Sequence, residues 1–131
     1  MSHTLLRYGM VGVMVAALTQ CDSGPKAGDL TAELTTTTQL GAAMFKVIAA
    51  EPYAIDELTA ACSGCRAFMT RVSDREVRGI VTGAFGAGPL VHVGVSDRSV
   101  PEAYTIELMQ LARTTFALEG VVGKTLTFAT R

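Results

Sequence analysis

The sequence contains no tryptophan, few charged residues and no excess of charge of either sign. Lys and Arg number 11 and Asp and Glu number 12, so the formal net charge is -1. A protein that binds DNA or RNA through phosphates needs a positive surface that releases counterions. The composition provides no such field, and we predict no nucleic-acid partner. The 49% share of apolar residues in turn excludes wholesale disorder.

The N-terminal apolar run is too short to be a transmembrane helix. The uncharged stretch covers residues 8–20, whereas a helix needs ~20 apolar residues to cross the hydrocarbon core. Arg7 precedes this stretch, and polar residues begin at Asp22. A charged start, an apolar middle and a polar boundary form the plan of a secretory leader.

A cysteine, Cys21, stands at that boundary in the sequence LTQC. The leader resembles that of bacterial lipoprotein precursors, in which a lipobox ends in the cysteine that receives the lipid. Leu18, Thr19 and Cys21 match the lipobox, and Gln20 stands where the family has a small residue. The resemblance implies that residues 1–20 are a signal peptide and that Cys21 is lipidated. A secretory leader cut elsewhere and an uncleaved apolar helix of a cytoplasmic protein are the alternatives.

The same resemblance implies an address in the bacterial cell envelope. A diacylglycerol on Cys21 would contribute about 0.8 kcal/mol of membrane affinity per buried CH₂. In enterobacterial lipoproteins, an aspartate after the lipidated cysteine favours retention in the inner membrane, and Asp22 has that position. We therefore predict the periplasmic face of the inner membrane. Residues 21–29, rich in turn-forming and charged side chains, are predicted to be the lipid-anchored linker.

Two helices are predicted after the linker. Apolar residues and Thr37 recur at three-, four- and seven-residue spacings over residues 30–50, which favours an amphipathic helix. The Glu51-Pro52 pair ends it, because Pro52 lacks a backbone N–H and disfavours helix at the preceding residue. A second helix is predicted beyond it from a one-sided stripe: Ile55, Leu58, Cys62, Cys65, Met69 and Val72.

The second half of the chain is predicted to mix strands with one helix. Strands over residues 76–85 and 90–95, joined by a turn rich in Gly and Pro, form an antiparallel hairpin. A helix is predicted between Ser99 and Gly120, because Ser99 and Glu102 have capping-box spacing and Gly120 follows the helix end. The apolar stripe of this helix is Tyr104, Leu108, Leu111, Ala112, Phe116 and Leu118. A terminal strand near residues 125–129 lies beside the hairpin. The prediction is a single small α+β domain, residues 30–131, around one core.

The CSGC sequence, Cys62 to Cys65, is the strongest chemical signal. If Cys21 is lipidated, two thiols remain in the exported domain, and three residues apart on a helical turn they suit a disulfide. Two buried free thiols are one alternative. Thiol-disulfide exchange, with Cys62 as nucleophile and Cys65 as resolving thiol, is another, and it requires Cys62 at an exposed helix N-terminus. Metal or haem binding is a third.

Other catalytic and metal motifs are incomplete. Arg66 stands where covalent haem attachment requires histidine. His92 and Asp97 lack the second close ligand pair of a structural zinc site, and we expect His92 to face solvent between inward-facing Val91 and Val93. No serine has the GxSxG context of a nucleophile elbow. We predict no cofactor, no metal and no catalytic residue.

Four arginines form the most concentrated positive charge: Arg66, Arg71, Arg75 and Arg78. They indicate either a solvated face or a contact with anionic lipid headgroups, to which each basic side chain adds about 1 kcal/mol. The sequence therefore predicts a membrane-anchored envelope lipoprotein with a binding or structural role beside an envelope protein. An envelope thiol-disulfide oxidoreductase that uses the CSGC pair is the alternative function.

Overall fold

Alternating side chains shape the first two strands of the computed structural model, which describes residues 24–129. Strand β1 (Gly28–Thr35) buries Leu30, Ala32 and Leu34, whereas Thr31 between them is half-buried and Glu33 is exposed. Strand β2 (Leu40–Ala49) buries every second residue from Ala43 onward. A two-residue period places one set of side chains on one face of a sheet, so both strands present an apolar face to a core.

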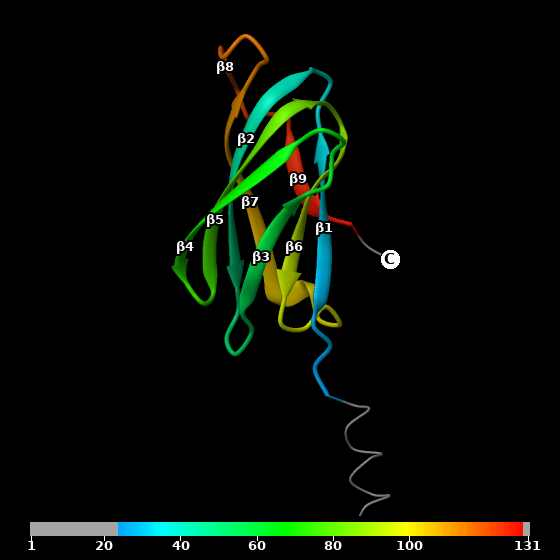
Figure 1. The fold of residues 1–131 in the computed structure, drawn as a ribbon, viewed down its shortest axis with the longest axis vertical. Helices are drawn as coiled ribbons and strands as arrows, with labels where there is room; N and C mark the ends of the chain where they lie inside the picture. Colours follow the sequence, from blue (N-terminus) through cyan, green and yellow to red (C-terminus); the bar gives the residue numbers. More distant parts are fainter. Residues whose placement is uncertain (1–23, 130–131) are drawn as a thin grey trace, which may run out of the picture.

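The strands form two antiparallel sheets that face each other as a sandwich (Figure 1). The first sheet has the order β3-β6-β1-β9, with β3 (Ile55–Ala60), β6 (Gly88–Val95) and β9 (Thr125–Phe128). The second has the order β4-β5-β2-β7-β8, with β4 (Arg66–Ser73), β5 (Glu76–Phe85), β7 (Tyr104–Ala112) and β8 (Leu118–Glu119). A short 3-10 helix, Pro101–Ala103, precedes β7.

The core lies between the inner faces of the two sheets. Phe45 is its largest fully buried side chain, and buried valines of β2, β5 and β6 belong to the same cluster. Gly79 of β5 makes room for the ring, because a Cβ on that glycine would lie 2.6 Å from Phe45 Cζ and 2.5 Å from Leu58 Cδ1. The glycine thus allows a phenyl ring and a leucine from the opposite sheet to meet over β5.

The α+β prediction is wrong: residues 24–129 contain no α-helix. The helix predicted over 30–50 is β1, a turn and β2, and the one predicted after Pro52 is β3, a loop and β4. The third predicted helix begins as the 3-10 turn at Pro101 and continues as β7. Sandwich packing, in which apolar sheet faces cover each other, replaces the predicted packing of helices on a hairpin.

The predicted strands exist, but the predicted hairpin does not. Strand β5 has the expected bounds, and β6 begins two residues before the expected Leu90. These two strands belong to different sheets, since β5 pairs with β4 and β2 whereas β6 pairs with β1 and β3. The turn after Phe85 therefore connects the two sheets. The predicted terminal strand is β9, and it pairs with β1.

The predicted signal peptide and Cys21 lie outside the described residues. Of the predicted linker, residues 24–27 precede the sandwich and residues 28–29 already belong to β1. No helix within residues 24–129 is long and apolar enough to cross a membrane. The described chain enters the sandwich at one end of the molecule (Figure 1).

Candidate functional site

Residues 113–124, which we call the tip segment, carry the most exposed apolar side chains of the described chain. Phe116 is 91% exposed, Leu118 71% and Val122 92%. The segment joins β7 to β9 through the short strand β8 and projects at the end opposite residue 24 (Figure 1). The sequence does not predict this surface, because Phe116 and Leu118 fit the apolar stripe of a helix.

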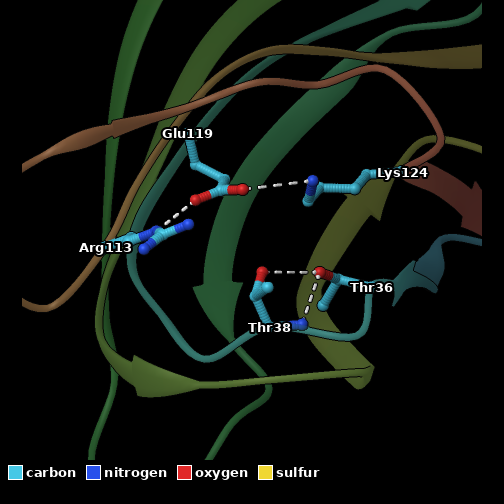
Figure 2. Close-up of polar contacts among 5 residues, drawn as sticks. All are labelled: Thr36, Thr38, Arg113, Glu119 and Lys124. Atoms are coloured by element: carbon cyan, nitrogen blue, oxygen red, sulfur yellow. Dashed lines mark hydrogen bonds and ion pairs between the residues drawn. The ribbon is translucent and has the colours of Figure 1, made fainter.

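An acidic side chain braces the tip segment from within. Glu119 contacts Arg113 Nε through Oε2, and its Oε1 lies 3.5 Å from Lys124 Nζ (Figure 2). The side chains of Glu119 and Lys124 are only 13% and 14% exposed. The hydrogen bond from Arg113 lowers the pKa of Glu119, opposed by its partial burial. The carboxylate therefore ties both ends of the segment together.

Phe116 occupies a backbone conformation that favours glycine. Its φ is 70°, in the left-handed region, where a bulky side chain is a genuine outlier. The amide of Phe116 donates to Arg113 O at 2.9 Å, and the amide of Arg113 donates to Ala117 O at 2.8 Å. These bonds hold the turn that directs the phenyl ring into solvent. Backbone strain of this kind gathers at binding sites, where the surrounding structure over-determines it.

The tip segment rests on the beginning of β2. A Cβ on Gly41 would lie 3.0 Å from both Arg113 O and Thr114 Cα, so the glycine permits a close approach of two backbones. The β1–β2 turn lies at the same end of the molecule (Figure 1). There Thr36 Oγ1 accepts a hydrogen bond from Thr38 N at 3.2 Å (Figure 2). The close approach at Gly41 therefore seats the base of the tip segment on β2.

A second apolar surface lies on the outer side of the five-stranded sheet. Phe68, Ile80 and Met44 are paired across β4, β5 and β2 and form one row. Phe68 is 56% exposed, and the other two side chains are half-buried. Arg66 of β4 lies in the row on one side, and Arg78 of β5 lies in the row on the other. We call these five residues the sheet face.

The four arginines of the predicted basic cluster do not share one surface. Arg71 donates to the carbonyl oxygen of Asp56 at 2.7 Å, and Arg75 Nη1 lies 3.3 Å from a Glu51 carboxylate oxygen. Within the described residues, neither Arg66 nor Arg78 has an ion-pair partner. Only these two flank the row of Phe68, so the predicted cluster is reduced to a pair.

The two described cysteines meet in the loop between β3 and β4. The sulfur atoms of Cys62 and Cys65 lie at bonding distance, 2.04 Å, and their Cα atoms are 5.5 Å apart. Both side chains are partly buried against the core. The loop joins two strands, so Cys62 is not at a helix N-terminus, whose dipole lowers a thiol pKa in redox enzymes. The geometry offers no support for the oxidoreductase alternative.

His92 and Asp97 have different hydrogen-bond partners, and neither is bonded to a described cysteine. His92 is half-buried on the outer face of β6, with Nδ1 2.8 Å from Thr31 Oγ1, while Val91 and Val93 are buried. Asp97 is buried and accepts from the hydroxyl and amide of Ser99 at 2.5 and 3.0 Å, which keeps the pKa of its carboxyl below the ordinary value. No three His, Cys, Asp or Glu residues in the range 24–129 are placed to hold a metal.

An open hollow of about 920 Å³ lies beside β1, near the end of β9. Its lining carries side chains of both charges: Lys26 and Arg98 are positive, and Asp29, Glu33 and Glu102 are negative. Every buried side-chain polar atom of the described residues has a hydrogen-bond partner, so none points unsatisfied into the hollow. The lining selects neither an anionic nor a cationic ligand.

Comparisons with known proteins identify no relative of the chain. No protein-family model matches the chain, and neither a curated protein nor a solved structure matches it significantly. The tip segment and the sheet face are therefore the two features on which a function can be built.

Proposed function

We propose that the protein is a membrane-anchored envelope lipoprotein with a binding role, and that its β-sandwich holds an envelope protein through the tip segment. The observation that supports this function is the exposure of Phe116, Leu118 and Val122 on one braced segment. Burial of apolar area on binding contributes roughly 25 cal/mol per Å². Aromatic side chains are enriched among the residues that dominate interface energies.

Rigidity is the second argument for the tip segment as a binding surface. Ordering of side chains and loops opposes association, at a cost of about 0.5–1.5 kcal/mol for each rotamer-rich side chain that is immobilised. The bonds of Glu119 to Arg113 and Lys124 fix both ends of the segment before any partner arrives. A larger share of the apolar burial energy then remains as affinity.

The anchor proposal rests on the lipobox-like leader. Lipidation of Cys21 would hold the chain at the membrane by its N-terminal end, on the periplasmic face of the inner membrane if Asp22 acts as a retention signal. The described chain begins at one end of the sandwich, and the tip segment projects from the opposite end (Figure 1). Attachment at Cys21 therefore leaves the tip segment accessible to a protein beside the membrane.

The test compares three versions of the native protein extracted from membranes in mild detergent. The triple variant F116S/L118S/V122S removes the apolar surface, and Val72→Ser is the matched control, because Val72 is 57% exposed on β4. We expect native mass spectrometry to show wild type and the Val72 variant in a complex of fixed stoichiometry with one other protein. The triple variant should be free of it.

Retention of the complex by the triple variant would contradict the proposal, and so would a wild type without a partner. Melting temperatures serve as the check on folding. Surface substitutions at exposed positions change the free energy of unfolding by about 0.5 kcal/mol or less. A bound partner raises the melting temperature, so all three proteins should melt together once they are separated from the partner. A loss of binding without a loss of stability then belongs to the interface.

A further inference from the structure

We propose that the sheet face docks the domain onto an anionic phospholipid surface. The face consists of the row Phe68, Ile80 and Met44, with Arg66 and Arg78 in the rows on either side. This inference goes beyond the proposed function and shares with it only the placement of the chain at a membrane. It assigns an orientation to the domain that partner binding at the tip segment does not require.

The charges of the sheet face favour an anionic occupant. Arg66 and Arg78 are exposed and lack ion-pair partners within the described residues, so both guanidinium groups can bind phosphate oxygens. Lys46, next to Arg78, is engaged with Glu107 at 3.3 Å. Arg71 and Arg75, by contrast, are bonded to groups of the chain itself, the carbonyl oxygen of Asp56 and the carboxylate of Glu51.

The apolar row explains why the occupant is a bilayer surface. Phe68 projects from the strand at the sheet edge with more than half of its surface in solvent, between the two arginines. A bilayer interface accepts an apolar side chain into the acyl boundary while cationic side chains remain among the headgroups. Each basic side chain near an anionic surface adds its own share of attraction, so the two arginines and the ring act together.

The sheet face can reach the membrane from the proposed anchor. Residues 22–25 lie between Cys21 and Lys26, whose backbone is hydrogen-bonded to Asp97 and Arg98, and four extended residues span at most about 14 Å. This reach allows the sandwich to turn onto its side. The tip segment belongs to the end of the molecule away from residue 24 (Figure 1), so it stays at the rim of the docked domain.

Tryptophan fluorescence tests the proposal directly, because the chain contains no tryptophan. Phe68→Trp places one indole in the sheet face, and Phe116→Trp places one in the tip segment as the matched control. The full chain is reconstituted on two kinds of vesicle, both with brominated acyl chains. One kind contains phosphatidylcholine alone, and the other contains equal parts of phosphatidylcholine and phosphatidylglycerol. We expect a blue shift and quenching for Phe68→Trp on the anionic vesicles only, and neither change for Phe116→Trp.

Charge-matched variants in the Phe68→Trp background separate contact from general attraction. R66Q/R78Q removes two charges of the sheet face, and at ~1 kcal/mol per charge this lowers the docking equilibrium constant about 30-fold. R71Q/R75Q removes the same number of charges outside the sheet face. It should change the docking equilibrium constant by less than about threefold, because salt screens the attraction of these side chains to the headgroups. An equal loss in both double variants would overturn the assignment of Arg66 and Arg78.

Three other results would overturn the proposal. Quenching of Phe116→Trp in place of Phe68→Trp would make the tip segment the membrane contact. Absence of quenching at both positions would leave the sheet face without a lipid role. A blue shift of Phe68→Trp that grows with protein concentration without vesicles would mean that a second copy covers the face. Co-sedimentation with phosphatidylcholine vesicles reports the N-terminal anchor separately, so failure of the anchor and failure of the sheet face are distinguishable.

Discussion

Glu119 is hydrogen-bonded to Arg113 across the base of the tip segment. The pairing joins the end of β7 to β8, and the second carboxylate oxygen of Glu119 reaches Lys124 before β9 begins. One side chain thereby closes a segment that would otherwise be a long surface connection. The proposed binding surface depends on this closure.

Glu119→Gln should loosen the tip segment while leaving the sandwich folded. The amide keeps the shape of the carboxylate but loses the charge that both cations share. We expect hydrogen exchange to become faster in residues 113–124 and to remain unchanged in β2 and β5, since local opening is independent of global unfolding. Glu102→Gln, at an exposed position with no ion pair among the described residues, is the matched control. Unchanged exchange in the tip segment would contradict the bracing role.

Asp97→Asn should show a stability deficit that depends on pH. The bonds from Ser99 lower the pKa of the Asp97 carboxyl in the folded state. Such a group contributes stability that is fully present above its unfolded-state pKa, near 3.8, and is lost as pH falls through the lower folded-state value. We expect the variant to melt below wild type at neutral pH and the gap to shrink in acid. A gap that widens in acid would contradict this sign.

Gly79→Ala should destabilise the sandwich. The added methyl group meets Phe45 and Leu58 at distances too short for contact, and overpacking of this kind costs about 1–3 kcal/mol. Gly120→Ala is the matched control, because an added Cβ there has no neighbour within 4 Å. Urea unfolding at equilibrium measures both. Equal stability of the two variants would contradict the placement of Phe45 over Gly79.

The pairing of Cys62 with Cys65 is tested by alkylation. We expect both cysteines of the native protein to resist iodoacetamide until a reductant is added, as intact mass will show. Loss of the bond in the variant C62S/C65S should lower the free energy of unfolding by no more than about 2 kcal/mol, because it closes a short loop. Alkylation of the unreduced protein at either cysteine would contradict a disulfide.

The helix predictions failed because a spacing of four residues fits both periods. Leu30 and Leu34 share one face of a helix and also one face of a strand. The residue that decides is Ala32 between them, which is buried as a strand requires. A small apolar residue adds little to an apolar stripe, so the alternation through Ala32 is weak in the sequence.

Bulges supplied the three-residue spacings that imitated a helix. Ile55 and Leu58 pair with Val95 and Val93, which are only two residues apart, so β3 contains an extra residue. Likewise, Met109 is extra between Leu108 and Gln110 in the pairing of β7 with β2. Beyond a bulge, the residues of a strand that face inward are displaced by one position. Sequence periodicity alone cannot separate this from a helical turn.

Strand β5 was predictable from local signals, whereas its neighbours were not. Gly79 and Gly83 disfavour a long helix, and the remaining residues of 76–85 favour a strand. Which sheet a strand joins depends on contacts far apart in the sequence, and the pairing of β6 with β1 spans about half of the chain. The tip segment is not predictable from apolar patterning, because apolar residues are expected to be buried and Phe116 and Leu118 are exposed.

The intact mass of the native protein extracted from membranes shows whether the chain begins at a lipidated Cys21. We expect a chain that begins at Cys21 and carries the added mass of a lipid. A full-length chain that begins at Met1 without a lipid would contradict the envelope assignment. It would also return Cys21 to the free thiols and place the tip segment and the sheet face in a different compartment.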